Sequence, residues 1–242
     1  MDKLIFTAVS GAERTMRAQQ VHANNLANID TSGFRANLEV AATQAQQRGY
    51  GYDSMHLAQT QADTISTRSG AVRETGRPLD VAINGGGYLA VQYDGGEAYT
   101  RAGAIDIDAN GALSVGGHPL IGEGGPITLP PHQAVEIGTD GTISVLTEGA
   151  TAMQAIDKLR LVNAEGAELT KNEAGLIVSR QGEPLEADAN VSVRGGALEG
   201  SNVSAVEEMV AVMSLNRSFE IQMKLFKASD SMNDVGNRLI GA

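Results

Sequence analysis

Six residues near the middle of the chain, Asp106–Gly111, have the oxygen-rich spacing of a calcium-binding loop. Their side chains match the first half of an EF-hand loop, in which alternate oxygen ligands bind the ion. Position twelve of that loop requires a bidentate glutamate, and Gly117 stands there instead. The pair Asn110-Gly111 is typical of a tight hairpin turn, because both residues tolerate positive φ. We therefore predict a β-hairpin here, with weak calcium binding as the alternative.

A glycine-rich stretch, Gly85–Gly87, formally begins a dinucleotide-binding fingerprint that Ala90 completes. In a true fingerprint the glycines follow a strand and open a helix whose N-terminus holds the pyrophosphate. Here the following residues, Tyr88–Tyr93, are rich in β-formers and predict a strand. We therefore predict no nucleotide site and no bound cofactor.

Side chains for acid-base catalysis are present, but their spacing matches no catalytic motif. The four histidines are His22, His56, His118 and His132. None has the H-x-x-x-H or H-E-x-x-H spacing of a metal site, and the chain contains no G-x-S-x-G or G-x-x-x-x-G-K motif. Two carboxylate pairs, at positions 106 and 108 and at 207 and 208, could flank a glycosidic bond, but their neighbours indicate a turn and a helix start. We predict no catalytic and no metal-binding residue, and no enzyme.

Composition narrows the class of protein further. The 242 residues are 42% hydrophobic, which can supply a core, and the formal net charge is -11. A nucleic-acid binder needs a basic face to displace counterions, so nucleic acid is not an expected partner, and anionic membrane surfaces are disfavoured as well. The chain has no cysteine, so no disulfide or Cys-based zinc site can form. No stretch is long and apolar enough to insert into a membrane, and the N-terminus lacks the pattern of a cleaved secretory signal.

The chain begins and ends with amphipathic segments. Apolar residues recur every three or four positions from Ile5 to Leu26, interrupted only by Gln19, which predicts a helix with a narrow seam. Asparagines and the turn sequence Asp30–Gly33 then end this helix. Near the C-terminus, Ser204 and Glu207 form a capping box that predicts a helix start. That second helix carries a similar seam and a neighbouring stripe rich in methionine.

Four segments give the chain a family resemblance. They are Ala23–Phe34 with the sequence ANNLANIDTSGF, Thr75–Gly85, Tyr99–Gly103 and Leu198–Val203. In this order they resemble the motifs of the flagellar axial proteins, the family of rod, hook and hook-associated subunits. The short length and the opening residues Met1–Ala8 resemble the proximal-rod members most, with distal-rod and hook subunits as alternatives.

The resemblance implies a structural subunit of the flagellar basal-body rod, which crosses the periplasm and transmits torque. It implies helical assembly with other rod subunits and export by the type III apparatus without a cleaved signal peptide. Two alternatives from other classes stay open. One is a secreted carbohydrate-active enzyme or adhesin that acts through its β-rich part, and the other is a cytoplasmic coiled-coil adaptor.

Between the helices the sequence predicts an extended arm and a β-rich domain. The polar stretch 36–75 is short of strand formers, and 185–200 has an alternating pattern that could pair with it as a hairpin. From 76 to 184, short β-rich runs are separated by glycine turns such as Asp94-Gly95 and Asp140-Gly141.

The predicted fold is therefore α+β. A discontinuous, coiled-coil-like helical domain is made of residues 1–35 and 201–242, the extended arm of 36–75 and 185–200, and the inserted β-rich domain of 76–184. The predicted assembly interface consists of Ile5, Val9, Met16, Asn24, Asn25, Leu26, Asn28, Phe34, Val206, Met209, Phe219, Ile221, Leu225, Met232 and Leu239.

Overall fold

The computed structural model describes residues 2–45 and 56–240, and it describes side-chain burial for 7–38, 64–232, 235 and 238. Two long helices and many strands make this an α+β chain, as predicted. The chain divides into two compact units. The first unit contains residues 1–27, 37–63 and 204–242, and the second contains 28–36 and 64–203.

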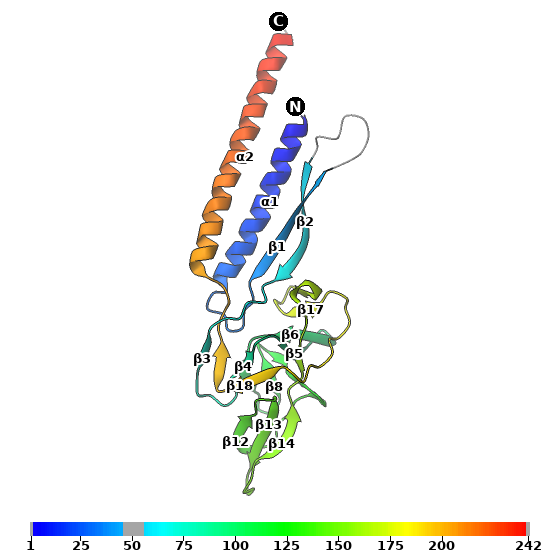
Figure 1. The fold of residues 1–242 in the computed structure, drawn as a ribbon, viewed down its shortest axis with the longest axis vertical. Helices are drawn as coiled ribbons and strands as arrows, with labels where there is room; N and C mark the ends of the chain where they lie inside the picture. The colour runs from blue at the N-terminus through cyan, green and yellow to red at the C-terminus, as the bar shows by residue number, and fades with distance from the viewer. Residues whose placement is uncertain (1, 46–55, 241–242) are drawn as a thin grey trace. The chain divides into compact units, whose positions relative to one another are not determined.

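The first unit is built on the two predicted helices, α1 (Asp2–Ala27) and α2 (Ala205–Ile240). They lie side by side, and β1 (Asn37–Ala45) lies against α1 (Figure 1). β1 pairs with β2 (His56–Ile65), most of which belongs to this unit. The polar stretch after α1 therefore contains two long strands that pair with each other, although its composition is poor in strand formers.

The helix ends follow the predicted signals. Ser204 caps α2: its hydroxyl accepts the Glu207 amide at 3.5 Å and its carbonyl accepts the Glu208 amide at 3.0 Å. After α1, the Thr31 amide donates to the Asn28 carbonyl at 3.2 Å, and Gly33 follows with a φ of 69°. Glycine is favoured at that position because a side chain there would be strained.

The second unit contains the β-rich part. Its largest sheet has the order β15-β5-β6-β17-β16, and a three-stranded sheet has the order β12-β13-β14. The bounds of these strands are β5 Tyr88–Tyr93, β6 Gly96–Thr100, β15 Leu161–Val162, β16 Leu169–Lys171, β17 Ile177–Ser179, β12 His132–Ile137, β13 Thr142–Thr147 and β14 Gln154–Lys158. A short 3₁₀ helix, Gly166–Glu168, precedes β16.

Smaller sheets complete the second unit. They pair β3 with β19, β4 with β18, β10 with β11, and β7 with β8 and β9, all antiparallel. Their bounds are β3 Val72–Glu74, β4 Val81–Asn84, β7 Ile105–Ile107, β8 Leu113–Val115, β9 His118–Pro119, β10 Ile121–Gly122, β11 Gly125–Pro126, β18 Ser192–Gly195 and β19 Ala197–Glu199. The segment 185–200 thus contains two strands with different partners. β19 pairs with β3 of the predicted arm, and β18 pairs with β4 of the β-rich part.

Tight turns join the hairpins at the predicted dipeptides. Asp94 and Gly95 both have positive φ, 47° and 75°, at the turn between β5 and β6. At the turn before β8, one carboxylate oxygen of Asp108 accepts the amides of Asn110 and Ala112, both at 2.8 Å. These hydrogen bonds lower the pKa of Asp108. The Asp106–Gly111 segment is therefore the predicted hairpin, and Asp108 holds its turn.

Buried aliphatic side chains of the small and large sheets form the core of the second unit. Val81 and Ile83 of β4 pack with Leu89 and Val91 of β5, and Ile143 of β13 belongs to the same cluster. A smaller cluster lies around Tyr88 and Tyr99 on the large sheet. Such burial is the main free-energy source of a folded domain. Among the described helices, none has the length and apolar character that would let it cross a membrane.

Candidate assembly site

The face that α1 presents to α2 is mostly small and polar. Thr15 is buried, and its hydroxyl lies 3.4 Å from the Gln222 side chain. Gln19 donates to Asn216 at 2.9 Å. A side chain at position 11 would come within 3.0 Å of the Gln222 amide, so Gly11 leaves room for this contact. Polar contacts therefore take part in the helix pair, beside the partly buried apolar side chains of Val212, Leu215 and Phe219 on α2.

Two residues in the last turns of α1 continue this polar face. His22 contacts the carboxylate of Glu208. Asn25 is buried, and its amide donates to Glu208 at 3.2 Å. The same side chain makes two bonds to the backbone of Asn37, donating to the carbonyl at 3.1 Å and accepting the amide at 2.9 Å. Asn25 thereby ties the end of α1 to both α2 and the start of β1.

The predicted seams do not pack against each other. Val9 and Met16 on α1 are exposed, and so are Ile221, Leu225 and Met232 on α2. These described seam residues of the predicted assembly interface are therefore exposed on the surface of the helix pair. The side chains of Ile5 and Leu239 lie outside the described residues.

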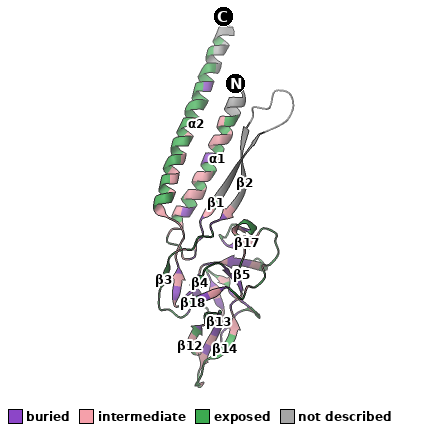
Figure 2. Cartoon of the chain, in the orientation of Figure 1, coloured by how far each residue is buried: buried purple, intermediate pink, exposed green. Residues whose placement is uncertain are grey.

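One face of α2 is apolar and exposed, and we call it the outer face. It consists of Val206, Val210, Met213, Ile221, Leu225, Met232 and Val235. Steps of three, four, seven and eight residues place these side chains on one side of the helix. Val206 is 68% exposed, Leu225 50% and Met232 62%. Figure 2 shows that α2 is exposed along most of its length.

The remaining predicted interface residues are divided between the two units. In the first unit, Asn24 and Met209 are exposed, whereas Leu26 and Phe219 are partly buried. In the second unit, the Asn28 carboxamide accepts the Thr31 hydroxyl at 3.2 Å, and Phe34 is partly buried. The predicted interface thus combines residues of α2, on and beside its outer face, with exposed residues of α1 and residues near the end of α1.

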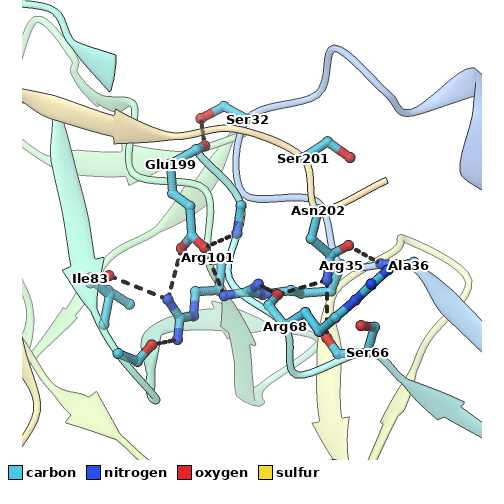
Figure 3. A network of polar contacts seen from close by, with 12 residues as sticks. Ser32, Arg35, Ala36, Ser66, Arg68, Ile83, Arg101, Glu199, Ser201 and Asn202 are labelled. Carbon is cyan, nitrogen blue, oxygen red and sulfur yellow. Dashed lines mark hydrogen bonds and ion pairs between the residues drawn. The ribbon is translucent and has the colours of Figure 1, made fainter. Parts of the chain in front are cut away.

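A buried polar cluster joins three of the motifs that carry the family resemblance. We call it the Glu199 cluster: Ser32, Arg35, Arg101, Glu199 and Asn202 (Figure 3). Ser32 and Arg35 come from the segment after α1, Arg101 follows β6, and Glu199 ends β19. Each charged side chain is almost fully buried, with 2%, 2% and 1% of Arg35, Arg101 and Glu199 exposed.

Glu199 is the centre of this cluster. One carboxylate oxygen accepts Arg35 at 2.9 Å and the Gly70 amide at 2.7 Å, and the other accepts Arg101 at 2.7 Å. Its backbone carbonyl accepts the Ser32 hydroxyl at 2.9 Å and the Gly33 amide at 2.8 Å. One residue therefore holds three separate chain segments through both its side chain and its backbone.

Asn202 binds the same segments a short distance away. Its side-chain oxygen accepts the Ala36 amide at 2.7 Å, and its amide group donates to the Arg68 carbonyl at 2.8 Å. The Arg35 guanidinium also contacts that carbonyl. Residues 28–36, 64–70 and 199–203 are thus bonded to one another at the places where the chain passes from one unit to the other.

The cluster contains more positive than negative charge. Two guanidinium groups share one carboxylate, and burial together with the neighbouring Arg101 charge lowers the pKa of Arg35. The Nε atoms of both arginines are buried, and neither has a hydrogen-bond partner among the described residues. Burying charges is costly unless they are paired and hydrogen-bonded. This cluster is therefore a weak source of stability, and removing its single anion would leave two unpaired cations.

Close backbone contacts explain two glycines of the motifs. A side chain at Gly33 would come within 2.2 Å of the Ala102 amide nitrogen, and one at Gly103 within 1.6 Å of the Val81 carbonyl oxygen. No side chain fits at such distances without moving the backbone. The motifs Ala23–Phe34 and Tyr99–Gly103 are therefore packed directly against each other or against β4.

Lys171, at the end of β16, lies on the segment that follows α1. Its ammonium group is 3.7 Å from the centre of the Phe34 ring and donates to the Arg35 carbonyl at 2.6 Å. Burial lowers the pKa of Lys171 to about 8. The Phe34 ring opposes this shift because it attracts the charged form, but desolvation is the larger effect.

This pKa shift predicts a pH dependence. Between about pH 8 and its ordinary pKa, Lys171 is protonated in the unfolded chain and neutral in the folded one, so the free energy of unfolding rises with pH. The rise is at most ~1.4 kcal/mol per pH unit for one proton. Above pH 10 the raised pKa values of Tyr88 and Tyr99 act in the opposite direction. Urea denaturation at pH 7.5 and 9.5 should show the rise in the wild type and lose it in Lys171→Met. An unchanged pH dependence in Lys171→Met would contradict the assignment.

The sequence did not single out the charged residues of this site. In the sequence, Arg101 and Glu199 stand out only as members of motif segments, and His22 and Glu208 only as possible catalytic residues. A usable signal was present, because Arg101 and Glu199 are the charged residues of the two short motif segments Tyr99–Gly103 and Leu198–Val203, and Arg35 directly follows the first motif. The glycines at 85–87 precede β5, and the Gly85 carbonyl contacts the Arg101 guanidinium, so this stretch belongs to the same site.

Three families of known proteins match parts of this chain. The description "Flagella basal body rod protein" matches residues 5–35, "Flagellar hook protein FlgE/F/G D1 domain" matches 82–145, and "Flagellar basal body rod FlgEFG protein C-terminal" matches 194–239. The class defined by fold and motifs is therefore that of the flagellar rod and hook subunits.

Individual relatives narrow the class. The chain is 40% identical over 254 residues to flagellar basal-body rod protein FlgF of Salmonella typhimurium strain LT2, and 39% identical over 249 residues to FlgF of Escherichia coli K12, with 99% of each chain covered in both cases. It is 33% identical to FlgG of Buchnera aphidicola subsp. Schizaphis graminum, over 89% of this chain and 92% of that one. The chain belongs to the FlgF family of flagellar basal-body rod proteins, and it is a structural subunit of the basal body.

Proposed function

We propose that this subunit assembles with other rod subunits through α1 and the outer face of α2. The observation that carries the proposal is the position of the apolar side chains on α2. Polar side chains of α2 bond to α1, whereas large apolar side chains are exposed along the outer face. Exposed apolar side chains gathered on one side of a helix are typical of a protein interface.

The geometry favours a helical assembly. An apolar stripe along a helix of 36 residues offers a long contact, at about 1.5 Å per residue. Val9 and Met16 add exposed apolar side chains on α1. If different surfaces of one subunit meet successive neighbours, the contacts propagate helically instead of closing into a dimer. Methionines on these stripes tolerate neighbours of slightly different shape, which suits contacts with non-identical rod subunits.

The remaining expectations complete the proposal. The subunit is not an enzyme, it occupies the proximal rod across the periplasm, and it transmits torque through its contacts with neighbouring subunits. α1 also serves export through the type III apparatus, without cleavage. The interface includes residues of α1, of α2 and of the segment up to Phe34.

The test separates export from assembly. In a strain lacking the native gene, a chain without residues 2–27 should keep a folded second unit, because the core of that unit contains no residue of α1. It should be retained in the cytoplasm, and swimming should be lost. The measurement is immunodetection in cytoplasmic, periplasmic and basal-body fractions, together with swimming in soft agar.

The control keeps α1 and changes only its exposed apolar side chains. A Val9→Asp, Met16→Asp chain should be exported, but it should be absent from purified basal bodies. Incorporation of either altered chain into basal bodies, with normal swimming, would contradict the proposal.

A further inference from the structure

We propose that Arg35, Arg101 and Glu199 are positioning residues, which set the direction in which the segment 28–36 leaves the second unit. They contribute geometry to rod assembly more than free energy to folding. The inference deepens the proposed function and rests on it, since the direction matters only if α1 and α2 contact neighbouring subunits.

The first argument is the number of segments that converge on Glu199. Its two carboxylate oxygens and its carbonyl bind Ser32, Gly33, Arg35, Gly70 and Arg101. Three of these residues belong to the segment that follows α1, and Gly70 belongs to the segment that follows β2. A single rigid acceptor with five directional bonds fixes the relative placement of these segments within the second unit.

The second argument concerns the choice of chemistry. Hydrophobic side chains would fill the same buried volume without a desolvation penalty, and replacing a buried ion triad with apolar residues is often neutral or stabilising. Apolar packing is non-directional, however, whereas an arginine-carboxylate pair has a fixed geometry. The Nε atoms of Arg35 and Arg101 are buried without a hydrogen-bond partner among the described residues, so the cluster carries a desolvation penalty.

The third argument is the surrounding structure. Arg101 also donates to the Ile83 carbonyl at 3.4 Å and lies 5.6 Å from the Tyr88 ring centre, so it is anchored to the core strands β4 and β5. The hydrogen bonds of the Arg35 guanidinium are with Glu199 and the Arg68 carbonyl, and none of those described is with β4 or β5. Glu199 therefore links Arg35, in the segment that follows α1, to Arg101, which is held by the core strands.

The test uses a triple variant, Arg35→Met, Arg101→Met and Glu199→Met, beside Glu199→Ala. Because the triple variant leaves no guanidinium unpaired, it should recover at least half of the loss in urea midpoint that Glu199→Ala causes. The Gly70 amide remains without its acceptor, so recovery need not be complete. A triple variant as unstable as Glu199→Ala would overturn the inference.

Position is measured directly by spin labels. The chain has no cysteine, so Asp30→Cys and Gln133→Cys, both exposed in the second unit, can be labelled selectively. The distance distribution should be at least twofold broader in the triple variant than in the wild type, and the triple variant should not restore swimming. A matched control, Glu74→Met with Arg194→Met, removes an exposed ion pair from neighbouring strands. It should change neither the distance distribution nor swimming.

The outcomes separate the two proposals. If the triple variant gives the wild-type distance distribution between the spin labels, or restores normal swimming, the positioning role is wrong. If the unaltered chain fails to restore swimming in the strain lacking the gene, the proposed function is wrong. The distance distribution then still decides whether the three residues position the segment.

Discussion

Replacing Leu225 with aspartate should abolish swimming while leaving the free chain folded. Leu225 is 50% exposed on the outer face of α2, so the carboxylate stays hydrated in the free subunit and should change the free energy of unfolding by less than ~0.5 kcal/mol. In the proposed assembly the same side chain would be buried against a neighbour. An unpaired buried carboxylate costs several kcal/mol or is neutralised, and the cost recurs at every subunit. Rod growth should therefore stop.

The measurement compares circular dichroism of the purified chain with basal-body yield and swimming at matched expression. Asp106→Asn combined with Asp108→Asn is the control, because it removes the carboxylates that a calcium site or a hydrolase would need. Asparagine keeps an oxygen that can accept the turn amides of Asn110 and Ala112. Cells that express this control variant should swim normally. Loss of swimming in the control together with a silent Leu225→Asp would favour a site in the β-rich part over assembly.

Local sequence signals predicted the helices and hairpins well. The capping box predicted the start of α2, and the dipeptides Asp94-Gly95 and Asn110-Gly111 predicted turns. Both kinds of signal depend only on a few adjacent residues. The partner of a helix face is not a local property. Both the polar and the apolar positions of α1 recur with helical spacing, and the pattern alone does not show which of them faces α2.

The same reasoning explains why β1 and β2 were not predicted as strands. Their sequences are rich in glutamine, alanine and threonine, and β-propensity is weak where pairing and packing decide the structure. The Glu199 cluster was not predicted from the sequence for a different reason. Arg35, Arg101 and Glu199 are far apart in the chain, and only the folded sheets bring them together.

Truncating Glu199 to alanine is expected to destabilise the second unit strongly. It removes the one anion between two buried guanidinium groups and leaves the Gly70 amide without its acceptor. Breaking a buried ion pair by removing one partner costs about 3–5 kcal/mol, a large part of the stability of an ordinary domain. The expected result is a large fall in the urea midpoint.

A neighbouring glutamate provides the matched control. Glu74 lies on β3, the strand paired with β19, and contacts Arg194 on the surface, where both side chains are more than half exposed. Exposed ion pairs contribute about 0–1 kcal/mol, so Glu74→Ala should lower the midpoint only slightly. Equal losses in the two variants would mean that Glu199 acts only as a surface charge does. A large difference would show that its effect comes from burial between Arg35 and Arg101, where neither cation can recover the solvation it lost on folding.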